Sequence, residues 1–143
     1  MRGSRLGHEW RLAQGRLLAV RCYTDCNGDV LMGAAHTALI DSFLLTVSRF
    51  PRLGRFWKHP SGLCESVNGY KIKYGLKGSS DVIGILGNGH GTFIGLEFKV
   101  GADRLSEAQG NFRRMIQEFH GVYLEVRDTK IALKNLEELC QNK

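Results

Sequence analysis

The feature of this sequence that most constrains its fold is a pair of strand-like segments, residues 81–86 and 92–100, separated by a glycine-containing turn at 87–91. The first segment is mostly aliphatic, and the second alternates before it ends in charge, which is typical of neighbouring strands. Residues 105–120 then carry apolar side chains at helical spacing, which predicts an amphipathic helix packed on the hairpin. Together with a further strand, this order predicts a mixed α/β domain. The helix residues expected to face inward are Leu105, Ala108, Phe112, Met115, Ile116 and Phe119.

The remaining segments add elements of both kinds around this hairpin. Residues 34–49 have helical periodicity, and Pro51 ends that pattern. Asn68-Gly69 is a hairpin signal between two further strand-like segments. The other strands are expected at 55–58, 63–67, 70–74 and Val122–Val126, and a closing helix at Thr129–Gln141.

The length and composition predict one domain with an extension in front of it. A chain of 143 residues is long enough for one hydrophobic core. Residues 1–32 are expected to form an N-terminal extension, and residues 33–143 the domain. In the extension, Asn27-Gly28 is a hairpin signal between strands expected at 17–24 and 30–32. Because no apolar run has the length of a membrane span or a secretory signal, we expect a soluble, cytoplasmic protein with no membrane partner. The cysteines lack the paired spacing of a zinc site and are expected to be free thiols; they are Cys22, Cys26, Cys64 and Cys140.

The net charge of +6 is concentrated in residues 49–77, which hold seven basic residues, one acid and five aromatic residues. Such a surface suits a polyanion, because Lys and Arg release counterions from phosphates and aromatic rings stack on bases. A solvated basic face would have the same composition, so charge alone leaves both interpretations open. The basic residues are Arg49, Arg52, Arg55, Lys58, Lys71, Lys73 and Lys77.

Three residues of the central hairpin, Asp81, Glu97 and Lys99, are candidates for a metal-dependent catalytic site. Glu97 and Lys99 are two apart on one strand and so share a face, and counting across the turn places Asp81 nearly opposite Glu97. Facing carboxylates repel unless a cation lies between them, and such hard oxygen ligands suit Mg²⁺ or Mn²⁺. Lys99 would then lie beside a metal-bound water, as phosphodiester hydrolysis requires. A surface Glu–Lys pair with Asp81 capping a turn would explain the same residues without catalysis.

The same residues lie in a longer pattern that resembles a known family. Residues 74–84 (YGLKGSSDVIG) followed by 94–99 (IGLEFK) strongly resemble the VRR-NUC nucleases, the virus-type replication-repair branch of the PD-(D/E)XK superfamily. Residues 57–62, 101–109 and 121–123 look like further elements of that family, so that the resemblance covers residues 34–127.

The resemblance implies an α/β, PD-(D/E)XK restriction-endonuclease-like fold, with a mixed central β-sheet flanked by α-helices. It also implies that Asp81, Glu97 and the backbone carbonyl of Phe98 bind Mg²⁺ or Mn²⁺, that Lys99 serves the attacking water, and that Gln109 supports the site. A capping box with Ser106 would explain Gln109 without catalysis, and both roles remain open. The family's first-helix glutamate has no counterpart, and the sequence leaves open whether His36 or Asp41 replaces it.

The function expected from this resemblance is metal-dependent endonucleolytic cleavage of DNA. Small stand-alone members imply a homodimer that acts on branched DNA such as four-way (Holliday) junctions. A nucleic-acid-binding module without catalysis, or a protein–protein adaptor, are the competing interpretations. The residues expected to contact DNA are Arg55, Lys58, His59, Ser61, Lys71, Lys73, Lys77 and Ser79.

Overall fold

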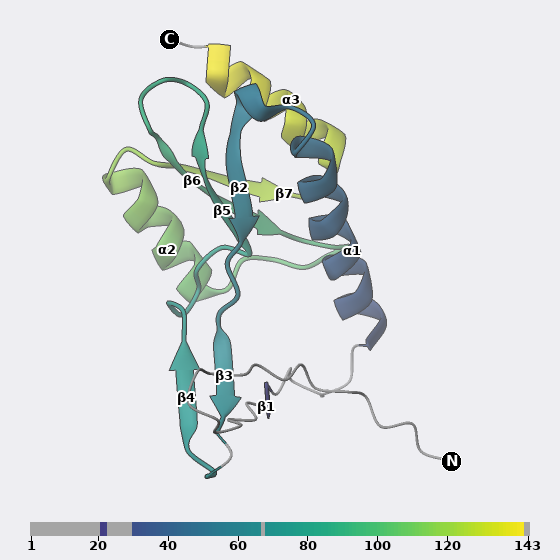
Figure 1. Cartoon of the computed structure of the whole chain (residues 1–143), viewed down its shortest axis with the longest axis vertical. Helices are drawn as coiled ribbons and strands as arrows, with labels where there is room; N and C mark the ends of the chain where they lie inside the picture. Colours follow the sequence, from purple (N-terminus) through teal and green to yellow (C-terminus); the bar gives the residue numbers. More distant parts are fainter. Residues whose placement is uncertain (1–20, 23–29, 67, 142–143) are drawn as a thin grey trace, which may run out of the picture.

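The computed structural model describes residues 21–22, 30–66 and 68–141, and its elements form a mixed α/β fold (Figure 1). In chain order they are β1 (Arg21–Cys22), α1 (Val30–Val47), the 3₁₀ turn η1 (Pro51–Leu53), β2 (Gly54–Lys58), β3 (Gly62–Glu65), β4 (Lys71–Tyr74), β5 (Val82–Leu86), β6 (Phe93–Phe98), α2 (Glu107–Glu118), β7 (Val122–Val126) and α3 (Thr129–Gln141). None of the helices in these described ranges is both long and apolar enough to cross a membrane.

The main sheet has four strands in the order β2-β5-β6-β7. The pairs β2–β5 and β5–β6 are antiparallel, whereas β6–β7 is parallel, so the sheet is mixed. The parallel pair requires a crossover, and α2 supplies it. The hairpin predicted around residues 87–91 is therefore confirmed, together with the crossover helix that follows it.

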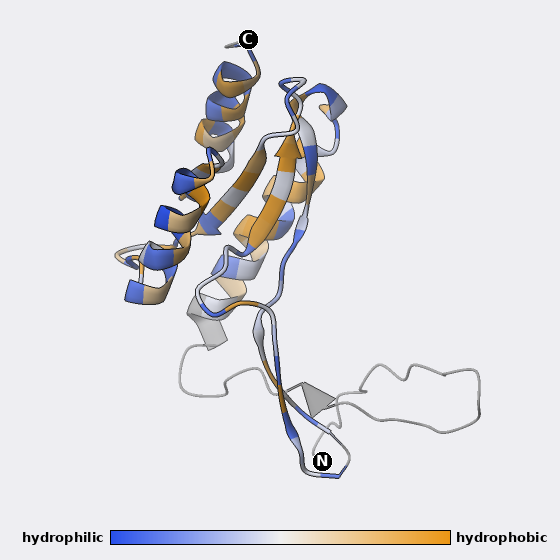
Figure 2. Cartoon of the chain, turned by 90° about the vertical axis from the view of Figure 1, so that its left-hand side faces the viewer, coloured by the Kyte–Doolittle hydropathy of each residue, from blue (hydrophilic) through white to orange (hydrophobic). Residues whose placement is uncertain are grey.

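The second sheet, in the order β1-β3-β4, is an arm that projects away from the main sheet (Figure 1). Its β3–β4 hairpin is antiparallel, as Asn68-Gly69 predicted, with Glu65 paired to Lys71. Hydrophobic residues are concentrated on the strands of the main sheet, and the arm is mostly hydrophilic (Figure 2). The chain therefore consists of a core region and an exposed arm.

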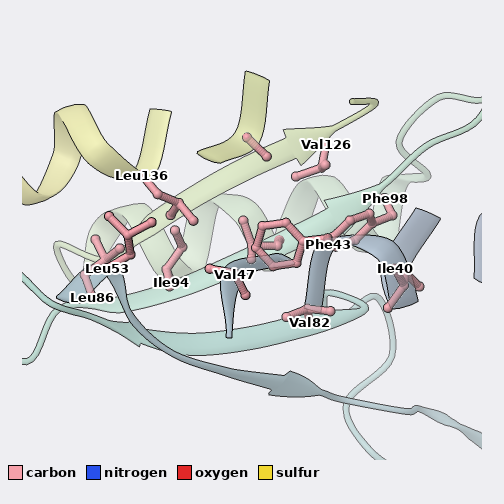
Figure 3. Packing of buried hydrophobic residues seen from close by; sticks show 12 residues of the cluster. Ile40, Phe43, Val47, Leu53, Val82, Leu86, Ile94, Phe98, Val126 and Leu136 are labelled. Carbon is pink, nitrogen blue, oxygen red and sulfur yellow. The ribbon is translucent and has the colours of Figure 1, made fainter. Parts of the chain in front are cut away.

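Alternation along β6 divides the core between the two faces of the main sheet. Ile94, Leu96 and Phe98 point toward α1 and α3, where Phe43 and Leu136 complete a fully buried hydrocarbon cluster (Figure 3). Phe43 contacts Phe98 edge-on, with ring centroids 5.4 Å apart. The opposite face of the sheet, covered by α2, has a much smaller apolar cluster of Phe112, Ile116 and Tyr123 with Phe93 and Leu105 beside them.

Two sequence predictions about helices are wrong. Val30 already lies in α1, so residues 30–32 are the start of a helix rather than the second strand of a hairpin. The first strand of that predicted hairpin falls mostly outside the described residues, apart from β1. On α2, Met115 is exposed and Phe119 is 82% exposed, although both were expected to face inward. The helix ends at Glu118, and its buried apolar side chains are the i, i+4 pair Phe112 and Ile116.

Candidate active site

The end of the β5–β6 hairpin brings Asp81 and Glu97 to the same place. The strands pair Val82 with Leu96, and continuing this register by one residue sets Asp81 opposite Glu97. Asp81 is held there by two backbone contacts: the N–H of Phe98 donates to its Oδ2 at 2.9 Å, and its carbonyl oxygen accepts the N–H of His59 at 2.8 Å. The two carboxylates therefore come from neighbouring strands at one end of the sheet.

Glu97, Lys99 and Gln109 form a buried polar cluster beneath α2. Glu97 is 1% exposed and Lys99 is 4% exposed. Lys99 Nζ lies 3.2 Å from Glu97 Oε1 and donates to Gln109 Oε1 at 3.1 Å. Gln109 Nε2 donates to the same Oε1 of Glu97, so each of the three side chains contacts the other two. A half-exposed carboxylate, Asp103, lies 3.4 Å from Lys99 Nζ on the outer side.

The first turn of α2 fixes Gln109. Gln109 Oε1 accepts the N–H of Ser106 at 2.8 Å, and Ser106 Oγ accepts the N–H of Gln109 at 3.3 Å, which is a capping box. The side chain of Gln109 therefore caps α2 and contacts Lys99 at the same time. Gly78, with φ +80°, lets the loop before Asp81 approach this turn, because a Cβ there would lie 2.3 Å from the backbone of Ala108.

Burial, and then the neighbouring charge of Asp81, raise the pKa of Glu97 to about 7, although Lys99 opposes the shift. Glu97 Oε2 is buried and has no hydrogen-bond partner among the described residues. Burial, and then the charge of Glu97, also raise the pKa of the Tyr123 phenol on β7, so this group stays neutral. Beneath α2 the site is therefore a buried polar cluster, in which a carboxyl with a raised pKa contacts a lysine.

The sequence left open whether His36 or Asp41 replaces the first-helix acid, and of the two it is His36 that contacts Asp81. Its Nε2 lies 3.2 Å from Asp81 Oδ2 and 3.0 Å from the carbonyl oxygen of Phe98. Asp41, the other alternative, instead pairs with Lys58. A signal was present in the sequence, because His36 precedes the buried Ile40 by one helical turn and so shares its stripe.

The residues expected to contact DNA lie in several places. Lys58, His59, Ser61 and Ser79 line one pocket of about 250 Å³ together with Asp81. Ser79 is 7% exposed, and its hydroxyl has no partner within the described part of the chain. The others lie outside this pocket: Arg55 is exposed on β2, Lys71 and Lys73 are exposed on the arm, and Lys77 lines a separate hollow beside the start of α2.

The donor atoms at this end of the sheet are of the chemical type that binds a divalent cation. Hard oxygens come from Asp81, Glu97 and the Phe98 carbonyl, and the unpartnered Oε2 of Glu97 is available. No three His, Cys, Asp or Glu side chains in the described ranges converge closely enough to hold an ion by themselves. Mg²⁺ and Mn²⁺ commonly keep several waters and need few protein ligands, so this donor set still fits them.

Neither the cysteines nor comparisons with known proteins point to a function. Cys140 is a free thiol, as predicted, and the side chains of the other three cysteines lie outside the description. No protein-family model, no curated protein and no solved structure matches the chain.

Proposed function

We propose that this chain is a metal-dependent DNA endonuclease with a PD-(D/E)XK fold, in which Asp81, Glu97 and Lys99 perform the hydrolysis of a phosphodiester. The observation that carries the proposal is the buried Lys99, held by Glu97 and Gln109 one strand away from Asp81. Burying a charge pair costs several kcal/mol per ion before its attraction is counted, and apolar residues of similar volume would often serve stability better. This arrangement is therefore better explained by catalysis than by folding.

The roles follow from where the side chains lie. Asp81, Glu97 and the Phe98 carbonyl would hold Mg²⁺ or Mn²⁺, which when bound would polarise the phosphate and lower the pKa of a coordinated water. Lys99 would donate a hydrogen bond to the attacking water and offset the negative charge that develops on the phosphate. Gln109 keeps the Lys99 ammonium in place, since it contacts both Lys99 and Glu97.

The pocket next to Asp81 supplies a place for the DNA backbone. Lys58 brings a positive charge to its lining, His59 and Ser61 bring further polar side chains, and the unpartnered Ser79 hydroxyl is a free donor. Phosphate oxygens accept hydrogen bonds from such groups, so a strand lying here would bring its phosphodiester toward Asp81. Lys71 and Lys73 on the arm would contact the backbone farther away. Branched DNA as substrate and a homodimer as the active form are parts of the same proposal.

The test is cleavage of a labelled four-way junction and of its linear duplex with Mg²⁺, Mn²⁺ or EDTA. We expect metal-dependent cutting that falls at least about a hundredfold in Lys99→Met, because removing a transition-state donor typically has that effect. The matched control is Lys134→Met, since Lys134 is an exposed lysine on α3. Equal cutting of junction and duplex by a homogeneous dimer would remove the branched-substrate part. Salt-sensitive binding without cutting would overturn catalysis and leave a DNA-binding module.

A further inference from the structure

We propose that His36 is a metal ligand and that this nitrogen makes the site selective for Mn²⁺ over Mg²⁺. The inference rests on the proposed function only in taking Asp81 and the Phe98 carbonyl as ligands to the ion. His36 Nε2 faces both of these groups, at 3.2 Å from Asp81 Oδ2 and 3.0 Å from Phe98 O. His36 Nε2 therefore lies within 3.2 Å of two potential donor oxygens that come from two other segments of the chain.

The two distances from His36 Nε2 match the separation of adjacent ligands around an octahedral ion. Ligands about 2.1 Å from such an ion lie about 3.0 Å from their neighbours in the coordination shell. The two separations from His36 Nε2 are close to that value without any rearrangement of the backbone. A single N–H on Nε2 must otherwise be shared between two oxygens, whereas a cation would be bound by all three atoms.

His36 is free to present a lone pair at Nε2. A neutral imidazole has one N–H and one acceptor nitrogen, so binding through Nε2 requires the proton on Nδ1. Nδ1 has no hydrogen-bond partner among the residues that the structure describes, and the side chain is about one-third exposed. The change of tautomer therefore breaks no contact other than the two that the metal would replace.

A donor set that combines an imidazole nitrogen with oxygens raises the affinity for Mn²⁺ relative to Mg²⁺. Carboxylate, carbonyl and water ligands suit Mg²⁺ and Mn²⁺ alike, but an imidazole favours the transition metal. Magnesium also demands near-ideal geometry from oxygen ligands. We therefore expect the full-length protein to bind Mn²⁺ at least about tenfold more tightly than Mg²⁺, and His36→Glu to narrow that ratio by restoring an oxygen donor.

Pulsed EPR on the Mn²⁺-loaded protein tests the ligand directly. We expect electron spin echo modulation from a directly bound ¹⁴N, and we expect labelling with ¹⁵N-histidine to change it. The signal should disappear in His36→Gln and persist in His90→Gln, the matched control, because His90 is exposed in the turn after β5. Calorimetric titration should show about tenfold weaker Mn²⁺ binding in His36→Gln and little change in the control.

The outcomes separate this inference from the proposed function. Metal-dependent DNA cutting without nitrogen coupling would overturn the ligand role, make His36 a positioning residue that only holds Asp81, and leave the nuclease standing. Nitrogen coupling from His36 without cutting would support the ligand role and overturn the nuclease. Failure to bind Mn²⁺, with wild type no different from Asp81→Asn, would overturn both.

Discussion

On the face of the main sheet that α1 and α3 cover, β6 buries Ile94, Leu96 and Phe98 in hydrocarbon, whereas on the face that α2 covers it buries Glu97, with Lys99 just beyond its end. Both faces exclude water almost completely. Fully burying a large apolar side chain stabilises the fold by about 1.5–3 kcal/mol, but burying a charge costs several kcal/mol unless it is well paired. One face of the strand therefore stabilises the protein, and the other buries polar groups at a cost in stability.

The largest expected effect lies on the apolar face. Phe98→Ala should lower the free energy of unfolding by about 4 kcal/mol, because it removes a buried ring and leaves a cavity against Phe43. The control is Ile85→Ala, an exposed residue of the neighbouring strand, which should cost about 1 kcal/mol or less. Urea unfolding in EDTA measures both. Equal losses would mean that this face is not the main source of stability.

The second effect lies on the polar face and has a defined dependence on pH. The pKa of Glu97 is about 7 in the folded protein and 4.5 in an ordinary environment, so the folded state binds this proton more tightly than the unfolded state. The free energy of unfolding of the metal-free protein should therefore fall as pH rises from about 4.5 to about 7. The contribution of this group is about 3 kcal/mol, and it should level off above that range.

Glu97→Gln isolates that contribution, since glutamine has nothing to titrate. The difference between wild type and Glu97→Gln, measured by urea unfolding in EDTA at pH 5 and pH 8, should shift in favour of the variant at the higher pH. Glu118→Gln, at the exposed end of α2, should show no such shift. A pH dependence that is the same in wild type and Glu97→Gln would mean that the carboxylate is better solvated than its burial implies.

Much of the main sheet could be predicted from the sequence, because the determining signals are local. Alternation and the length of the 87–91 turn were sufficient to pair β5 with β6 and so to bring Asp81 opposite Glu97. The bounds of β7 and α3 agree with the prediction. Gln109 contacts Lys99, but its supporting role stays a prediction. The catalytic function itself stays a prediction.

The features that could not be predicted depend on packing between distant segments. The contact of His36 with Asp81 depends on how α1 crosses the end of the sheet, 45 residues away in sequence. The exposure of Phe119 depends on α2 ending one residue earlier, which helical periodicity does not report. Ser79 is buried in a loop whose Gly78 lies against Ala108 of α2, and no local pattern distinguishes it from an ordinary loop serine.

A smaller effect separates the two roles of Gln109. Ser106→Ala removes one half of the capping box and should cost about 1 kcal/mol of unfolding free energy. Gln109→Ala removes the other half and also leaves Glu97 and Lys99 without a shared partner, so it should cost about 2 kcal/mol. Thermal unfolding of both variants measures the difference. Equal losses would mean that Gln109 acts only as a cap and does not hold the buried pair.

The smallest effect concerns Asp103, whose carboxylate approaches Lys99 from the solvent side. Its Oδ2 lies 3.4 Å from Lys99 Nζ, but its side chain is half exposed, so water and salt screen the pair. Asp103→Asn should therefore change the free energy of unfolding by less than about 0.5 kcal/mol, and the change should disappear in 1 M NaCl when unfolding is followed by circular dichroism. A loss above about 1 kcal/mol that persists in salt would contradict the distinction between the buried and the screened partners of Lys99. It would mean that Asp103 belongs to the buried polar cluster beneath α2, and the polar face would then extend to the surface.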